Sequence, residues 1–305
     1  MLIKAADDKS GDIEQLEALL GRPSIGVDEK KRIEQELRAV RSGLKGEREA
    51  AYEIDFYYAP SKNYAVIHDL RLEHNGRVAQ IDHPVIGRFL DIWVCESKRF
   101  AEGIAVNEHG EFAAFYGGRA VGVPSPLEQN QKHCAVLQAL FIDRVIEAPK
   151  RLGIGLPVTL HSLVLVSKNA RISRPAAAVK GLEQILKVDQ FKSFLDEYLN
   201  KDNNPLTIAK VIGSDTLEQF ARSIAALHKP ASFDWAAKFG LQQTEAAPPA
   251  STAPTESGAA SKLACASCGI IVAYNVARFC WFNKPRFGGR VYCMDCQKAV
   301  RAVDG

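Results

Sequence analysis

The sequence lacks the marks of membrane and exported proteins. No run of about 18 or more apolar residues occurs among its 305 residues, which argues against a membrane-spanning helix. Residues 1–10 have neither the apolar core nor the cleavage site that a signal peptide needs. The formal net charge is only +3, so the total charge gives no argument for a nucleic-acid partner. We therefore expect a cytoplasmic protein.

Large apolar residues are also missing from residues 242–262, although the chain as a whole has an ordinary 47% of hydrophobic residues. Such a segment cannot bury enough surface to offset its ordering entropy, so it predicts a flexible linker. The remaining sequence is long enough for one sizeable domain and a small module. We expect a helical extension over residues 1–39, a main domain over 40–241 and a module over 263–305.

The main domain shows a mixed pattern of helical and extended segments. Apolar residues at spacings of three and four predict a helix over residues 28–58, although Gly43 and Gly46 also allow two helices in series. Strands are expected at 65–72, 78–86, 89–96 and 157–166, and further helices at 127–148, 179–200 and 215–228. This order predicts an α/β fold, a mixed β-sheet flanked by helices.

The most informative stretch lies between residues 80 and 98. Side chains alternate between the faces of a strand, so Glu96 and Lys98 point to the same side. If the segment around Asp82 lies beside that strand, Asp82 and Glu96 can converge on one Mg²⁺ or Mn²⁺ ion, with Lys98 next to a reacting phosphate. Glu-x-Lys is common on exposed strands, but four apolar residues precede Glu96. They indicate a buried strand, where charges without partners are costly.

Other polar residues can be gathered around this pair. Glu47 could hold a second metal ion or a metal-bound water, and Gln129 could align Lys98 or a phosphate. His83 should point to the opposite face of the strand from Asp82, which favours a structural role. His133 lies one helical turn after Gln129 and could either face the site or pack in the core.

Five segments together resemble the nuclease-related domain (NERD), a branch of the PD-(D/E)xK nuclease superfamily. They are Gly43-x-x-Gly46-Glu47, Val66-Ile67-His68-Asp69-Leu70, Gln80-Ile81-Asp82-His83, Glu96-Ser97-Lys98 and Pro126-Leu127-x-Gln129-x-x-x-His133. The resemblance covers about residues 40–145 and implies a restriction-endonuclease-like core with a metal-dependent nuclease site at Glu47, Asp82, Glu96, Lys98 and Gln129. Cys95, Ser125 and Pro84 depart from the family pattern. Proline removes a ladder donor, so the strand of Pro84 is expected at an edge or with a bulge.

Two C-x-x-C pairs near the C-terminus predict a structural Zn²⁺ site. Cys265 and Cys268 are separated by 24 residues from Cys293 and Cys296, which leaves room for a short hairpin in a zinc-ribbon module. Disulfides or unrelated free thiols are the alternatives, but in a reducing compartment this spacing favours zinc. A tail too small for its own core is expected to fold with its metal. Cys280 is expected to pack as an apolar residue, with exchange for one ligand as the alternative.

The same module is basic and rich in aromatic residues. Residues 263–305 contain six Lys or Arg residues and only two Asp residues. Cations that contact phosphate and aromatic rings that stack on bases are typical of nucleic-acid binding. The candidates are Arg278, Trp281, Lys284, Arg286 and Arg290. Packing of the aromatic residues around the zinc knuckles is the alternative.

These patterns together predict a Mg²⁺- or Mn²⁺-dependent nuclease that hydrolyses phosphodiester bonds of DNA, with the zinc module assisting nucleic-acid binding. One alternative is a protein that retains the fold but only binds nucleic acid or another protein. A hydrolase of other phosphate esters is a second alternative.

Overall fold

The computed structural model describes residues 1–201, 211–241 and 263–300. The chain divides into two compact units, Met1–Gln243 and Thr244–Gly305. The expected linker, residues 242–262, lies outside the described residues. Within the described ranges, none of the helices is long and apolar enough to cross a membrane.

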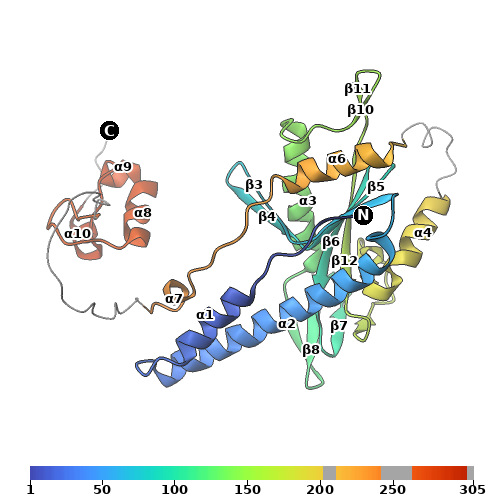
Figure 1. Ribbon diagram of the computed structural model, residues 1–305. Coiled ribbons are helices and arrows are strands. Elements are labelled where there is room, and N and C mark those ends of the chain that lie inside the picture. Colours follow the sequence, from blue (N-terminus) through green and yellow to red (C-terminus); the bar gives the residue numbers. More distant parts are fainter. Residues whose placement is uncertain (202–210, 242–262, 301–305) are drawn as a thin grey trace, which may run out of the picture. The chain divides into compact units, whose positions relative to one another are not determined.

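A six-stranded mixed sheet forms the centre of the first unit (Figure 1). The strand order is β1-β2-β5-β6-β12-β14, in which β5 pairs antiparallel with β2 and β6 and the other pairs are parallel. The strands are β1 (Leu2–Lys4), β2 (Tyr64–Ile67), β5 (His83–Gly87), β6 (Asp91–Lys98), β12 (Thr159–Val166) and β14 (Ile185–Lys187). The predicted mixed sheet flanked by helices is confirmed.

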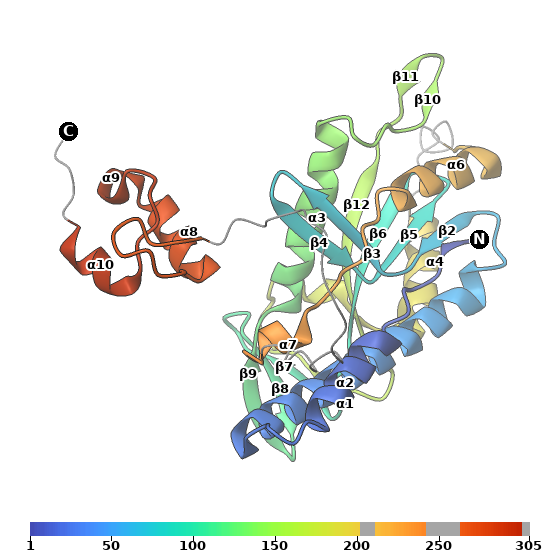
Figure 2. The same cartoon turned by 60° about the vertical axis from the view of Figure 1, so that its left-hand side comes forward.

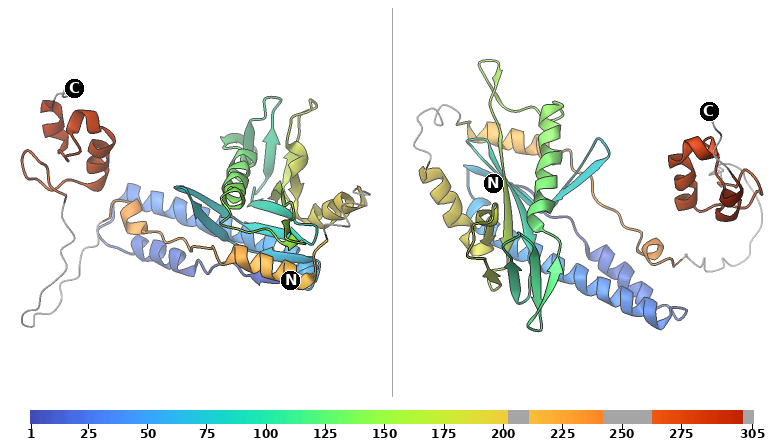
Figure 3. Two further views of the ribbon diagram at one scale, coloured as in Figure 1. Left: turned by 90° about the horizontal axis from the view of Figure 1, so that it is seen from above. Right: turned by 180° about the vertical axis from the view of Figure 1, so that it is seen from behind.

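Helices cover both faces of this sheet because its central strands are apolar on both sides. Val94 faces a core shared with α3 (Pro126–Ile142) and α6 (Ser214–Ala225). Its neighbour Cys95 faces the opposite core, shared with α2 (Val27–Tyr58) and α4 (Phe191–Lys201). Figure 3 shows α2 and α3 on opposite sides of the sheet. Strand alternation therefore sends Glu96 and Lys98 toward the α3 face.

Two expected strands are broken at acidic residues. Where residues 65–72 and 78–86 were each predicted to form one strand, the chain leaves the main sheet as the hairpin β3 (Leu70–His74) and β4 (Arg77–Ile81) (Figure 2). The breaks fall at Asp69, whose φ is 52°, and at Asp82. The N–H of Asp69 donates to the carbonyl of Asp82 over 2.8 Å. Both carboxylates thus stand at the joint between the hairpin and the main sheet.

A second, four-stranded sheet follows β6. Its order is β13-β7-β8-β9, from β7 (Gly103–Val106), β8 (Phe112–Tyr116), β9 (Arg119–Val123) and β13 (Arg171–Ser173). A two-stranded sheet is formed by β10 (Lys150–Arg151) and β11 (Ile154–Gly155). Two helices lie near the chain's two ends within this unit, α1 (Ser10–Leu20) and α7 (Trp235–Lys238), and both pack against one core with the first half of α2.

The helix predicted over residues 28–58 is confirmed as α2, which runs through Gly43 and Gly46 without a break. Two local expectations in this unit were wrong. Residues 179–190 are not helical throughout but contain β14 between two short 3₁₀ turns, since Ile185 pairs with β12. Pro84 lies in an interior strand rather than at an edge. It stands before the first paired residue of β5 against β2, where its missing N–H costs little.

Residues 263–300, the described part of the second unit, contain three short helices, α8 (Tyr274–Phe282), α9 (Lys284–Phe287) and α10 (Met294–Ala299). A single bridge pairs Ala264 with Ile271 around the first knuckle. Two helices therefore stand where a hairpin was expected. In α8, Ala277 and Cys280 are buried, and their spacing of three suits a helical turn and not strand alternation.

Candidate functional site

Asp82 and Glu96 are cross-strand neighbours on the α3 face of the sheet. His83 pairs with Cys95, so the same antiparallel register places Asp82 opposite Glu96. The Asp82 carboxylate is fixed by Ser97, whose backbone N–H and hydroxyl each donate to Oδ2 over 2.8 Å. Oδ1 accepts no hydrogen bond from the part of the chain that is described. One oxygen of Asp82 is thus anchored, and the other is available to a ligand.

Glu96 is deeply buried, with 2% of its surface exposed, and is held in the same way by one oxygen. Lys98 Nζ donates to Oε1 over 2.6 Å, and Gln129 Nε2 donates to the same oxygen over 2.8 Å. Oε2 lies 3.3 Å from His133 Nδ1 but makes no hydrogen bond of ordinary geometry with the described residues. Glu96, Lys98, Gln129 and His133 are therefore brought together, from β6 and the first turns of α3.

The two carboxylates differ in their affinity for a proton. Burial, together with the negative charges of Glu96 and Glu47, raises the pKa of Asp82 to about 8. Burial also opposes ionisation of Glu96, but His133 and Lys98 outweigh it and lower its pKa. A divalent cation bound here would neutralise the negative charges that oppose ionisation of Asp82.

Glu47 approaches the site from the other side of the sheet end, where α2 packs closely on the chain after β6. A Cβ on Gly46 would lie 2.7 Å from that of Arg99, so only glycine fits there without a shift. Glu47 does not contact Asp82 directly; its Oε2 accepts from Lys9 Nζ over 2.9 Å. The same ammonium lies 3.3 Å from Oδ2 of Asp69. The Gly-x-x-Gly-Glu motif thus positions a carboxylate that is already paired with a lysine.

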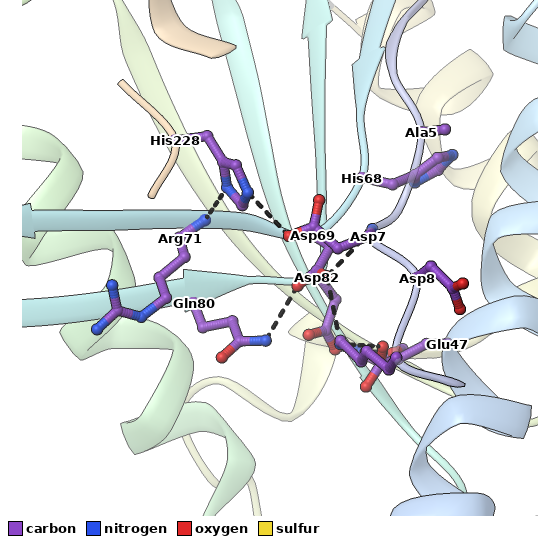
Figure 4. Close-up of polar contacts among 12 residues, drawn as sticks. Ala5, Asp7, Asp8, Glu47, His68, Asp69, Arg71, Gln80, Asp82 and His228 are labelled. Carbon is purple, nitrogen blue, oxygen red and sulfur yellow. Dashed lines mark hydrogen bonds and ion pairs between the residues drawn. The ribbon is translucent and has the colours of Figure 1, made fainter. Parts of the chain in front are cut away.

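The N-terminal segment before α1 lies over this carboxylate group (Figure 4). Asp7 accepts from His228 Nε2 over 2.9 Å, and His228 Nδ1 accepts from the backbone N–H of Arg71 over 3.0 Å. Gln80 donates to Asp69 Oδ1 over 3.0 Å. These residues border a cavity of about 320 Å³ that is also lined by Glu47 and by Trp235.

His83 points away from Asp82, as strand alternation predicts. It is buried on the α2 face, where its Nδ1 lies 2.8 Å from Nδ1 of His68, and His68 Nε2 lies 3.1 Å from Asp55 Oδ1. A proton on His68 Nε2 satisfies Asp55, so His83 Nδ1 must be the donor to His68. Burial and the neighbouring His68 lower the pKa of His83. These contacts suit a structural, uncharged imidazole.

The second unit brings the four predicted cysteines together. The Sγ atoms of Cys265, Cys268, Cys293 and Cys296 all lie within 4.8 Å of one another. Gly269, directly after the first knuckle, has a φ of +73°, as the tight turn requires. Hydrogen bonds from backbone N–H groups, first that of Cys293, lower the pKa of Cys265 to about 6, whereas the Cys293 thiol raises the pKa of Cys296 to about 12. Four converging sulfurs are a donor set suited to Zn²⁺.

Cys280 lies outside this cluster. It is fully buried, and its sulfur accepts from the N–H of Tyr292 and from Gln297 Nε2, each over 3.3 Å. Nearby, Phe287 is buried between the rings of Phe279 and Tyr292. At least some of the aromatic residues therefore build the module itself.

The basic candidates of this module differ from one another. Arg286 donates to the carbonyls of Gln297 and Val300 over 2.7 and 3.1 Å, so it caps the end of α10. Arg290 is exposed, and its side chain makes no hydrogen bond or ion pair with the residues that the structure describes. Trp281 is partly buried and interacts with another residue of the protein. The side chains of Arg278 and Lys284 lie outside the described part of the chain.

No role was assigned from the sequence to Lys9, to the pair Asp7–His228 or to Asp69, which was named only as part of a family motif. Asp69 left a signal, because it is a charge inside the apolar run from Ala65 to Leu72. Lys9 left none. It lies 38 residues before its partner Glu47, in a segment without any motif.

Comparison with known proteins gives one match. No curated protein and no solved structure matches the chain. The match covers the stretch from the middle of α2 to the end of β12. This stretch carries Glu47, Asp69, Asp82, Glu96, Lys98 and Gln129. Residues 42–167 match the family model of the nuclease-related domain.

Proposed function

We propose that the first unit is a PD-(D/E)xK-type nuclease, which hydrolyses phosphodiester bonds of DNA with Mg²⁺ or Mn²⁺. The observation that carries this proposal is the arrangement of Asp82 and Glu96 opposite each other on neighbouring strands, with Lys98 Nζ 2.6 Å from Glu96. The match of residues 42–167 to the nuclease-related domain supports a nucleic-acid substrate.

The donor atoms present fit a hard divalent cation. Asp82 keeps Oδ1 available, and Glu96 keeps a buried Oε2 that lacks a hydrogen bond of ordinary geometry with the described residues. Both are carboxylate oxygens, the ligands that Mg²⁺ and Mn²⁺ prefer. Bound there, the ion would neutralise phosphate charge and lower the pKa of a coordinated water.

The surrounding residues would hold and polarise the substrate. Lys98 is partly exposed, at 29% of its side chain, so its ammonium can donate to a phosphate oxygen while it remains against Glu96. Gln129 shares Oε1 of Glu96 with Lys98 and so orients the carboxylate. His133 on the next turn of α3 limits rotation of that carboxylate from the other side.

The second unit would assist by binding nucleic acid. Its proposed Zn²⁺ ion, held by Cys265, Cys268, Cys293 and Cys296, stabilises a small basic module. Residues 242–262 tether this module to the first unit, and a tether raises the effective concentration of bound DNA near the site.

The proposal is tested by cleavage of single- and double-stranded DNA by the zinc-loaded chain, with Mg²⁺ or Mn²⁺ added or left out. We expect metal-dependent cutting that falls by about 100-fold or more in Glu96→Ala and in Lys98→Ala, since one lost electrostatic contact in an active site costs about that much. Glu108→Gln is the control, because Glu108 is exposed in the loop between β7 and β8 and is not one of the proposed site residues.

Normal cutting by both Glu96→Ala and Lys98→Ala would show that the reaction occurs elsewhere. DNA binding without cutting by the wild type, in any of the metals, would instead favour the non-catalytic binding protein. Hydrolysis of small phosphate esters that DNA does not inhibit would favour a different phosphoesterase.

A further inference from the structure

Lys9 is held inside the carboxylate group by two ion pairs. Its Nζ lies 2.9 Å from Glu47 Oε2 and 3.3 Å from Asp69 Oδ2, and only 20% of the side chain is exposed. Burial opposes its charge, but the two carboxylates outweigh this effect and raise the pKa of Lys9. The lysine is therefore a charged, fixed cation and not a mobile surface side chain.

The segment that carries Lys9 is fastened at several points. Strand β1 pairs with β2, and Lys4 Nζ donates to the carbonyls of His68 and Asp69 over 3.1 Å each. Asp7 is bound to His228 Nε2 over 2.9 Å, and its own N–H points at Asp69 Oδ2 over 3.4 Å. We call residues 4–9 the strap. These contacts fix the position of the Lys9 ammonium from outside the segment that matches the nuclease-related domain.

Lys9 and its partner Glu47 lie close enough to Asp82 and its neighbour His83 for their charges to act on these residues. The charge of Glu47 contributes to the raised pKa of Asp82, and the charge of Lys9 contributes to the lowered pKa of His83, the residue next to it. The backbone of Asp69 is also hydrogen-bonded to that of Asp82. The Lys9 pocket and the Asp82–Glu96 pair are therefore two adjoining parts of one site.

The charges of this site leave room for one divalent ion. Asp7 also borders the pocket, but Lys4 Nζ balances it over 2.7 Å. The other charges are the four carboxylates of Glu47, Asp69, Asp82 and Glu96 and the ammonium groups of Lys9 and Lys98. One Mg²⁺ or Mn²⁺ ion at Asp82 and Glu96 balances the remaining two negative charges. Without the charge of Lys9 the remainder would be three, and Glu47 and Asp69 would offer oxygens to a further ion.

We propose that Lys9 is an internal cation that takes the place of a second divalent ion, so that the site holds a single Mg²⁺ or Mn²⁺ per chain. The location of that single ion at Asp82 and Glu96 rests on the proposed function. The role of Lys9 at Glu47 and Asp69 rests on the contacts of the strap.

The test counts Mn²⁺ ions bound per zinc-loaded full-length chain, from the electron paramagnetic resonance signal of the free ion. We expect one ion in the wild type, two in Lys9→Met, and none at the same concentrations in Asp82→Asn. Lys9→Gln should also bind two, because it keeps a hydrogen-bond donor for the carboxylates but removes the charge. Lys9→Arg and Lys45→Met should bind one. Lys45 is an exposed lysine two residues before Glu47 and serves as the matched control.

The outcomes separate this inference from the proposed function. One ion in both Lys9→Met and Lys9→Gln, with folding preserved in either, would overturn the role of Lys9 and leave the metal at Asp82 untouched. Two ions in the wild type would also overturn it. A wild type that binds no Mn²⁺, next to a Lys9→Gln variant that binds one, would support the Lys9 role and contradict the metal site at Asp82 and Glu96.

Discussion

The two clusters of candidate metal ligands in this chain are built in different ways. The carboxylate cluster takes its side chains from α2, the β2–β3 joint, the β4–β5 joint and β6, and it contains ammonium groups of its own at Lys9 and Lys98. The cysteine cluster takes all four sulfurs from two short knuckles. The first stands on a large α/β core that folds around it. The second stands in a unit whose described residues bury few apolar side chains: Cys265, Val272, Ala277, Cys280 and Phe287.

Because of this difference, the two proposed metal ions would contribute differently to the stability of the fold. A site whose charges are partly balanced by lysines can persist without its ion, because the sheet and its helices fix the side chains. A module with so small a core is expected to need its proposed zinc ion in order to fold, since structural zinc contributes about 10–16 kcal/mol in zinc-finger peptides.

The largest effect is expected from removing one sulfur of the cysteine cluster. Cys268→Ala should lose zinc and unfold residues 263–300, while the first unit keeps its secondary structure. Cys280→Ala is the matched control, because Cys280 is buried in the same module but lies outside the cluster. Zinc content measured by mass spectrometry and proteolysis of the second unit report the result. Equal zinc content in the two variants would show that the cluster is not a four-sulfur site.

Predictability from sequence follows the same division. Each cysteine knuckle is a local motif, so the spacing of the cysteines alone predicted that the four sulfurs come together. In the structure they lie within 4.8 Å of one another. The pairing of Glu96 with Lys98 could also be predicted from the sequence, because strand alternation is a local rule. Lys9 and His228 were not, since they reach Asp69 and Asp7 through contacts that join distant parts of the chain.

The fold shows the same limit. The mixed sheet flanked by helices followed from the pattern of apolar residues, but the breaks at Asp69 and Asp82 did not. In both segments the apolar residues continue past the break, since Leu70 and Ile81 are as buried as the strands of the main sheet. The hairpin departs because β2 bends into β3 at Asp69 and β4 bends into β5 at Asp82, while the antiparallel register continues across both joints. A run of apolar residues does not record such a bend.

A smaller effect should distinguish the carboxylate cluster by its pH dependence. The folded-state pKa of Asp82 is raised from 3.8 to about 8, so the folded protein binds this proton more tightly than the unfolded chain does. Without added Mg²⁺ or Mn²⁺, the free energy of unfolding of the first unit should therefore fall as pH rises from about 4 to about 8.

Asp82→Asn should remove that part of the decline, at least about 1 kcal/mol, since one pKa unit corresponds to about 1.4 kcal/mol. Urea denaturation followed by fluorescence of buried Trp93 measures it, with Glu108→Gln as the control. A decline of equal size in Asp82→Asn and in the wild type would mean that the pKa of Asp82 is not raised in the folded state. The positive charges of the site would then balance its carboxylates better than the distances indicate.

The smallest effect separates two arginines within the cysteine module. Arg286 is engaged with the carbonyls of Gln297 and Val300, so Arg286→Ala should lower the stability of the module by about 1 kcal/mol. Arg290 is exposed, so Arg290→Ala should leave stability unchanged and weaken DNA binding a few-fold, with the slope of log K against log salt reduced by about 1. Fluorescence anisotropy with labelled DNA over a range of salt concentrations measures the slope. An unchanged slope in Arg290→Ala would mean that this surface contacts no phosphate, and that the basic residues of the module serve its own packing as Arg286 does.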